Sequence, residues 1–455
     1  MSSSKLAVGA AKVDITPPLS IPYLGFHPRQ AKFEGVHDPL YARAAVFEGP
    51  QGQAALLSAD ALGLSRDLFG EGRDFIDEVR ERAADGTGLD PAAIVLAATH
   101  SHSTPETYGI TRIWEREDCA AWLQVLADQL AGALAMAWRD RRPAILSLGG
   151  ARVSGMSGNR RMRDHQGRLF SMGRKPQDAE IVDPGCLDEQ VAVLLAQREG
   201  AAPVLIANFA CHPVTVQVQE LISADFPGVA TRLVEQALGD GACCLFVQGA
   251  SGDINPIRDA TRDWRDVDTY GVMLAGGILH GIGQARLAQP LDAPLIGSGS
   301  RRLSVAAREA PTMQEATARK QEVDRTLADT PSDSPDYAQA LGQARQVWEM
   351  YRLVQFGAEP IEAEIQALRL GDLGIAAFPG ELFCELGMRL KSASPAPQTM
   401  VAECSNGCLG YLVPEKGWDD GGYEVGLGAW CRVAKGEPEK MVAAAQELLQ
   451  GLFEG

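Results

Sequence analysis

The chain contains only seven histidines in 455 residues, so the position of each is informative. His100 and His102 come directly after the apolar run Ala93–Ala98, which has the pattern of a buried strand. Residues two apart in an extended chain face the same side. Both imidazoles could therefore bind one metal ion, or one could bind the metal while the other faces a substrate. The structural alternative is a pair of histidines that bond to the backbone at a strand end.

Two further apolar runs are each followed by a residue that could bind a metal ion. Val204–Phe209 is followed by His212, and Leu373–Phe378 is followed by Glu381. We expect Glu381 to be the first residue of a helix that continues over Leu382–Lys391, where the helix dipole alone would favour a carboxylate. Three strand ends that supply His, His and Glu nevertheless match the ligands of a catalytic zinc site with an open position.

Other hydrolase motifs fit the sequence less well. The HxHxDH pattern of metallo-β-lactamases fails because Thr104 and Pro105 follow Ser103, and HExxH is absent. The serine-hydrolase motif GxSxG is absent too, because Asp253 stands at its last position in the segment 249–253. The residues favour a metal site over a serine nucleophile.

Short apolar runs alternate with amphipathic stretches over the first 290 residues, which predicts α/β architecture. Several of the apolar runs are continuous, as in a sheet that is covered on both faces. The predicted strands are Ala44–Glu48, Ala54–Ala59, Ala93–Ala98, Ile145–Gly149, Val191–Ala196, Val204–Phe209 and Cys244–Gln248. The predicted helices are Arg73–Ala84, Ala120–Trp138, Gly228–Leu238 and Asp266–Leu287.

The second half of the chain has a different composition. Residues 308–355 are rich in Glu, Gln, Lys, Arg and Ala around a Thr-Pro-Ser-Asp-Ser-Pro break, which predicts a helical hairpin insertion. Nothing in its composition indicates catalysis. Residues 361–367 alternate apolar and polar side chains, the period of a half-exposed strand, and Met441–Phe453 is predicted to be a closing helix. Without linkers or repeats, residues 1–455 are expected to form a single large domain of mixed sheets flanked by helices.

Composition excludes several kinds of partner. The formal net charge of −17 opposes nucleic acid and anionic membranes, so neither is an expected partner. The longest low-charge run, Gly271–Gln284, is too short to span a membrane. Lys12 and Asp14 interrupt the N-terminal segment where a signal peptide would be apolar, so we expect an uncleaved, cytoplasmic chain. The nine cysteines have no paired CxxC spacing and are expected to be reduced and mostly buried.

The order and spacing of several segments between Gly9 and about Val425 resemble the neutral/alkaline non-lysosomal ceramidases, in their catalytic N-terminal domain. The resemblance implies the fold of a zinc amidase. The matching segments are Val13–Pro17, His37–Arg43, Thr99–Ser103, Asn159-Arg160, Asn208–His212, Ser223–Gly228, Gln248–Asp253, Phe378–Glu381 and Tyr411–Tyr423.

Position by position, the resemblance implies that Zn²⁺ is bound by His100, His212, Glu381 and Tyr411. Phenolate is an uncommon zinc ligand, so Tyr411 is the most unusual member of this set. On residue type alone, a tyrosine here would be a packing residue with a polar hydroxyl.

The resemblance also implies that His102 is the general acid/base, while Arg160 and Tyr423 contact the substrate amide. Two positions depart from the family pattern. Asn255 stands where the family has a serine, which argues against a serine nucleophile there. The chain also ends 32 residues after Tyr423, so the C-terminal β-sandwich of the larger ceramidases is expected to be absent.

The sequence therefore predicts a zinc hydrolase that cleaves an N-acyl amide, on a soluble or short-chain small-molecule substrate and without stable membrane association. Two alternatives stay open. The same scaffold could hydrolyse an ester, lactone or sugar-derived bond, or it could be a non-enzymatic binding protein. Nothing in the sequence indicates an oligomeric state.

Overall fold

The computed structural model describes residues 6–23, 32–170, 181–291 and 294–454. A mixed eight-stranded sheet forms the centre of the fold, with strand order β14-β12-β11-β6-β1-β3-β4-β5. Its strands are β1 (Ala7–Asp14), β3 (Tyr41–Glu48), β4 (Gln53–Ala59), β5 (Ile94–Ala98), β6 (Arg142–Arg152), β11 (Gln190–Arg198), β12 (Val204–Phe209) and β14 (Cys243–Gln248). The predicted strands are confirmed, most of them with slightly wider bounds.

Most strands of the central sheet are largely apolar on both faces because both faces are covered. In β3, Ala44 and Val46 pack in one core, whereas Ala45 and Phe47 pack in a second core on the other side of the sheet. The same alternation holds in β4, β5, β11 and β12. The period of two along a strand thus divides a continuous apolar run between two cores, as its sequence predicts.

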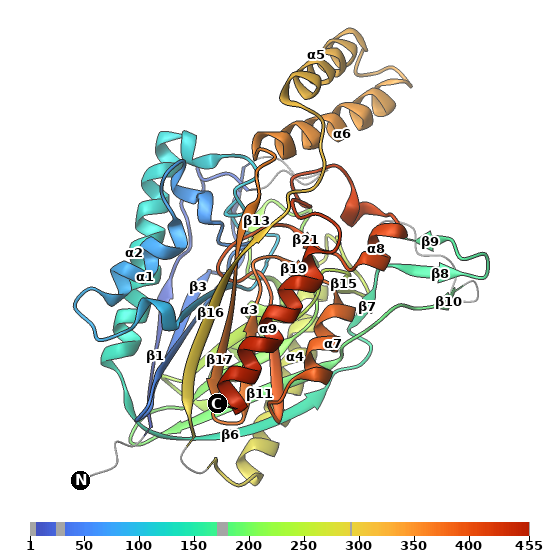
Figure 1. The fold of residues 1–455 in the computed structure, drawn as a ribbon. Helices are drawn as coiled ribbons and strands as arrows, with labels where there is room; N and C mark the ends of the chain where they lie inside the picture. The colour runs from blue at the N-terminus through green and yellow to red at the C-terminus, as the bar shows by residue number, and fades with distance from the viewer. Residues whose placement is uncertain (1–5, 24–31, 171–180, 292–293, 455) are drawn as a thin grey trace.

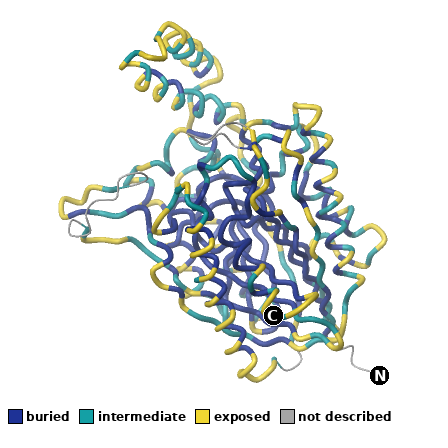
Figure 2. Tube along the Cα trace, turned by 180° about the vertical axis from the view of Figure 1, so that it is seen from behind, coloured by how far each residue is buried: buried dark blue, intermediate teal, exposed yellow. Residues whose placement is uncertain are grey.

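A four-stranded sheet and two groups of helices complete the layers (Figure 1). The second sheet comprises β16 (Ile296–Val305), β17 (Ile361–Leu370), β18 (Leu373–Ala377) and β20 (Gln398–Ala402), and packs on one face of the first. Helices α1 (Phe75–Ala84), α2 (Glu117–Arg139), α3 (Asp225–Leu238) and α4 (Trp264–Leu287) cover the other face. Helices α7 (Cys384–Ala393) and α9 (Glu437–Glu454) cover the outer face of the second sheet. Figure 2 shows the buried residues concentrated in the two sheets.

Helix α2 is long and apolar enough to meet the length and composition criteria for a membrane span. Half of its most apolar window is buried inside the fold, where side chains such as Leu123, Leu126 and Leu130 join the core beneath β1 and β3. Packing in the core therefore accounts for its apolar composition.

The strand predicted at residues 361–367 is present in β17, and Glu362 is exposed as predicted, but the expected exposure of Glu364 and Gln366 is wrong. Glu364 is 4% exposed and Gln366 is fully buried. Both face Arg80 of α1, whose Nη1 lies 2.9 Å from Oε2 of Glu364 and whose Nη2 donates to Oε1 of Gln366 at 2.9 Å. Glu364 and Gln366 are buried because a distant arginine pairs with them, which the local alternation of residues cannot reveal.

The two predicted helices of the hairpin are present as α5 (Met313–Asp329) and α6 (Tyr337–Gln355). Thr312 and Glu315 form a capping box that begins α5. The hairpin projects from one end of the body, and its surface is largely exposed (Figures 1 and 2). The end of α6 returns to the body, where Met350 and Leu353 are each only 4% exposed.

Candidate active site

His100 and His212 follow strands that lie toward opposite edges of the sheet order. The sheet curls so that these regions meet, as the 2.5 Å hydrogen bond from Ser58 Oγ in β4 to the carbonyl oxygen of Phe246 in β14 demonstrates. His100 adopts a left-handed backbone conformation with φ of 67°, which is uncommon for a residue other than glycine. Its backbone N–H donates to the carbonyl oxygen of Ala61 at 2.9 Å, which holds it in that conformation.

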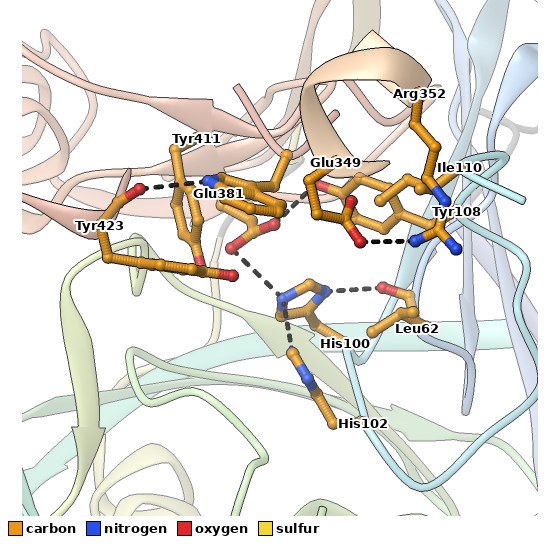
Figure 3. A pocket seen from close by; sticks show the side chains of 11 residues that line it. Leu62, His100, His102, Tyr108, Ile110, Glu349, Arg352, Glu381, Tyr411 and Tyr423 are labelled. Carbon is orange, nitrogen blue, oxygen red and sulfur yellow. Dashed lines mark hydrogen bonds and ion pairs between the residues drawn. The ribbon is translucent and has the colours of Figure 1, made fainter. Parts of the chain in front are cut away.

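Three imidazoles and one carboxylate converge at this point (Figure 3 shows His100, His102 and Glu381). The Nε2 atoms of His100 and His212 lie 3.2 Å apart, and Nε2 of His102 lies 3.3 Å from that of His100. Oε2 of Glu381 lies 3.1 Å from Nε2 of His212 and 3.6 Å from Nε2 of His100. The predicted ligands His100, His212 and Glu381 are thus brought together, with His102 beside them.

The hydrogen bonds made by Nδ1 in His100 and His212 determine the protonation of Nε2 in each ring. Nδ1 of His100 lies 2.6 Å from the carbonyl oxygen of Leu62, and Nδ1 of His212 lies 2.6 Å from that of Ser251. Because a carbonyl only accepts, each Nδ1 carries the hydrogen, so Nε2 is the atom of each ring that is left to offer a lone pair inward. Burial lowers the pKa of His212 to about 4, which keeps this ring neutral at pH 7.

Two inward lone pairs and a carboxylate oxygen within 3.6 Å of one another repel unless a cation lies between them. Histidines that ligate a metal through one ring nitrogen commonly donate the other N–H to a backbone carbonyl, as both rings do here. The residues present therefore fit a divalent metal ion of the kind that takes imidazole and carboxylate ligands.

Glu381 does not begin a helix as its sequence predicts. It lies in a short strand, β19 (Glu381–Leu382), which pairs in parallel with β21 (Tyr411–Leu412), and α7 begins only at Cys384. The N–H of Glu381 donates to the carbonyl oxygen of Gly410 at 2.9 Å, so a strand partner replaces the first helical turn. The hydroxyl of Tyr108 donates to Oε1 of Glu381 at 2.6 Å and leaves Oε2 directed at the histidines.

Tyr411 is placed next to Glu381 by this strand pairing. Gly410, just before it, has φ of +84°, and a Cβ there would lie 2.1 Å from the carbonyl oxygen of Trp430. Only glycine permits this close approach, so Gly410 helps to fix the position of Tyr411. Burial raises the pKa of Tyr411 well above its usual value, and the guanidinium of Arg160 lies 5.1 Å from its ring centre.

Arg160 lies behind Tyr411 with its donors directed at the protein. Its Nε donates to Oε1 of Glu424 at 2.9 Å, Nη1 to Oδ1 of Asn255 at 3.1 Å, and Nη2 to the carbonyl oxygen of Gly252 at 2.7 Å. Its predicted contact with the substrate amide stays a prediction, whereas its contacts with the loop that carries Tyr423 are present in the structure.

Glu424 is fully buried between two arginines that tie this loop to the body. Its second oxygen accepts from Nη1 of Arg161 at 2.5 Å. Burial alone would raise the pKa of Glu424, but Arg160 and Arg161 outweigh burial and lower it. The carboxylate is therefore ionised and compensates two buried positive charges beside Tyr423.

Replacing Glu424 by glutamine should lower the free energy of unfolding by about 3–5 kcal/mol, because two buried guanidiniums then lack their counter-ion. Urea unfolding followed by circular dichroism measures the change. Glu447→Gln is the matched control, since it breaks the exposed pair with Arg301 and should cost about 1 kcal/mol or less. A loss below about 1 kcal/mol for Glu424→Gln would contradict this account of the loop.

His100, His102, Glu381, Tyr411 and Tyr423 line a cavity of about 100 Å³, which we call the histidine cavity (Figure 3). The ring of Tyr423 stacks on Trp430 at 4.9 Å and meets Tyr411 edge-on at 6.0 Å. His212 does not line the cavity but lies against His100, which does. The other side chains that line it are Leu62, Tyr108, Ile110, Glu349, Arg352 and Trp430.

Sequence analysis missed two groups of residues at this site. Glu349 and Arg352 come from the hairpin, where their spacing of three along an amphipathic helix resembles an ordinary surface ion pair. Glu403 is fully buried, and its carboxylate accepts from the N–H and the hydroxyl of Ser251, the residue whose carbonyl holds His212. The spacing of Glu403 from Ser251 carries no local signal.

These features define an α/β protein in which strand ends carry a buried histidine and carboxylate centre suited to a metal ion. Residues 6–262 match the family described as "Neutral/alkaline non-lysosomal ceramidase, N-terminal". The chain belongs to this family. The match includes His100, His102, Arg160 and His212, whereas Glu381, Tyr411 and Tyr423 lie beyond it.

Individual relatives agree with this membership. The neutral ceramidase of Drosophila pseudoobscura pseudoobscura is 32% identical over 107 residues, which are 23% of this chain and 14% of that protein. The aligned region is thus a small part of that relative. A crystal structure of neutral ceramidase from Pseudomonas aeruginosa has the same fold, with a TM-score of 0.71 and 18% identity over 99% of this chain and 74% of that one. A structure described as "Ceramidase complexed with C2" matches with a TM-score of 0.70 and 17% identity, over 99% of this chain and 75% of that one.

Proposed function

We propose that the protein is a zinc-dependent hydrolase that cleaves the amide bond between an acyl group and an amine. The observation that carries the proposal is the convergence of two bare Nε2 lone pairs with Oε2 of Glu381 at the wall of a cavity, in a family whose named members are ceramidases. A non-enzymatic binding protein would have no need to bury these mutually repelling groups at the edge of a cavity.

In this proposal His100, His212 and Glu381 hold the zinc ion, and the phenol oxygen of Tyr411 is the fourth ligand. Zinc supplies a Lewis acid and a bound water with a pKa of about 7, so hydroxide is available at neutral pH. Tyr108 holds Glu381 through Oε1 so that Oε2 remains directed at the histidines. Arg160, beside Tyr411, favours the ionised phenolate that a metal ligand must be.

The remaining residues handle the substrate and its protons. His102 lines the cavity beside the proposed ligands and transfers a proton to the leaving nitrogen, a step of general acid catalysis. The hydroxyl of Tyr423 donates to the oxygen of the tetrahedral intermediate, as an oxyanion-hole donor does. Trp430 and the buried Arg160–Glu424–Arg161 cluster hold the loop that carries Tyr423. The products are a carboxylic acid and an amine.

A matched set of N-acyl amines, acyl esters and lactones tests the bond that is cleaved. We expect release of free amine and acid from at least one N-acyl amine, measured by liquid chromatography, with activity lost on chelation of the metal. Turnover of esters or lactones with no amide cleaved would contradict the amidase proposal, although a metal hydrolase would remain.

The substrate is proposed to be a soluble or short-chain N-acyl compound. The histidine cavity of about 100 Å³ is well below the roughly 300–1,000 Å³ of cavities that enclose drug-sized ligands. A charge of −17 also opposes docking to anionic bilayers. We expect higher kcat/KM on short-chain than on long-chain N-acyl amines, the latter presented in detergent and in liposomes. Efficient turnover of long-chain ceramide in liposomes with little on short chains would reverse this assignment.

A further inference from the structure

A second cavity of about 280 Å³ lies next to the histidine cavity and shares two of its lining residues, Ile110 and Arg352. We call it the arginine cavity. The end of helix α6 separates the two spaces, because Glu349 lines the first, Arg352 lines both and Phe356 lines the second. The two cavities therefore adjoin at Ile110 and Arg352.

Arg432 is largely buried and lines the arginine cavity, and not all of its guanidinium donors are engaged. Its side chain is 11% exposed and lies 3.8 Å above the ring of Phe356. Among the described residues, its side chain makes one long hydrogen bond, from Nη1 to Oδ2 of Asp67 at 3.4 Å, and its buried Nε has no partner. Burial lowers the pKa of Arg432, a sign of incomplete compensation of its charge. A hydrogen-bond acceptor bound in the cavity would pair with the unsatisfied donors of Arg432.

Arg352 is the second guanidinium with free donors. Its Nη1 donates to Oε1 of Glu349 at 2.5 Å, an interaction that fixes the side chain between the two cavities. Its Nε and Nη2 have no hydrogen-bond partner in the described part of the chain. A guanidinium whose Nη1 is fixed and whose Nε and Nη2 are open can donate two parallel hydrogen bonds to a planar carboxylate.

The other charged residues of the arginine cavity are already engaged or are acidic. Arg73 makes two hydrogen bonds to Glu78, and Arg112 pairs with Glu115. Asp67 and Glu71 also line the cavity and repel an anion, so an anion binds favourably only beside Arg352 and Arg432. Apolar surface comes from Ile110, Trp114 and Phe356, which suits a methylene chain better than a fully ionic ligand.

We propose that the arginine cavity is a subsite for a carboxylate, and that the preferred substrates are N-acyl amines with a carboxylate at the end of a short apolar arm. This proposal rests on the proposed amidase function and names the substrate class for it. The scissile amide lies in the histidine cavity, the arm passes Ile110, and Arg352 and Arg432 bind the terminal carboxylate. The hairpin thereby becomes the element that selects the substrate, through Arg352 and its partner Glu349.

The test compares N-acyl amines that end in a carboxylate with isosteric compounds that end in a neutral carboxamide, over a series of arm lengths. The wild-type protein should prefer the carboxylate in kcat/KM by roughly 10–100-fold at one arm length, as expected for charge-assisted hydrogen bonds. Arg352→Gln should bring this ratio close to one. Arg325→Gln, an exposed arginine on the same hairpin, is the matched control and should keep the wild-type ratio.

Arg432→Lys is the companion variant, because it keeps the buried charge but removes the planar pair of donors. It should lower the carboxylate preference while the protein remains folded by circular dichroism. A wild-type ratio near one at every arm length, or a preference that survives Arg352→Gln, would overturn the proposal.

Calorimetric titration with straight-chain dicarboxylates separates this proposal from the amidase function, because it needs no turnover. Affinity should peak at one chain length and fall roughly 10–100-fold in Arg352→Gln. If neutral N-acyl amides are hydrolysed but the dicarboxylates bind equally to both proteins, the subsite is wrong and the amidase stands. If no amide is hydrolysed but binding depends on Arg352, the subsite stands and the amidase proposal fails.

Discussion

His212→Ala is expected to give a folded protein that retains no zinc after dialysis and no longer hydrolyses N-acyl amines. The imidazole is fully buried, its Nδ1 is fixed by the carbonyl of Ser251, and its Nε2 lies 3.2 Å from that of His100. Loss of an outer-shell partner alone typically weakens metal binding about 10–100-fold, so loss of a ligand should weaken it by at least that factor. Elemental analysis gives the metal content, and circular dichroism reports folding.

His280→Ala is the matched control, because His280 is exposed on α4 and, among the described residues, does not belong to the group that could hold a metal ion. It should keep full metal content and full activity. A fully loaded and active His212→Ala protein would remove His212 from the proposed ligand set.

His102→Ala should retain the metal but lower kcat by about 10²–10⁴-fold, the contribution typical of a general acid or base. Glu381→Ala should instead lose the metal. Comparing His102→Ala with Glu381→Ala decides which residue is the third ligand. Nε2 of His102 lies nearly as close to Nε2 of His100 as that of His212 does, so the three imidazoles alone could form a ligand set. The second oxygen of Glu381, held by Tyr108, is what favours the carboxylate as the third ligand.

Both variants are measured for metal content and for kcat and KM on the same N-acyl amine. A proton-transfer role predicts that the loss in His102→Ala falls mainly on kcat. Loss of metal from His102→Ala with full retention in Glu381→Ala would exchange the roles assigned to these two residues.

Seven of the eight strands of the central sheet were predictable because their signal is local, whereas β1, which carries Lys12 and Asp14, was missed. In β3, β4 and β5 a continuous apolar run of four or more residues can only be satisfied where both faces are buried, and the structure buries both. His100 and His212 could be placed for the same reason, since they come two and three residues after the ends of predicted strands. Their meeting depends on the curl of the sheet, which no single strand specifies.

The sequence-based predictions failed where residues distant in the chain determine the local structure. Glu381 forms a strand because Tyr411, thirty residues later, supplies the partner for it. Glu364 is buried because Arg80 pairs with it across 284 residues. Glu349 and Arg352 have the spacing of a solvent-exposed pair, and only the return of α6 to the body places them in the cavity.

The most direct test of the account is the metal content of the purified protein, combined with hydrolysis of a short N-acyl amine before and after chelation. We expect one zinc ion per chain, loss of hydrolysis when the zinc is removed, and recovery when one equivalent of zinc is restored. Amide hydrolysis at an undiminished rate in the metal-free protein would contradict the proposed zinc-dependent mechanism.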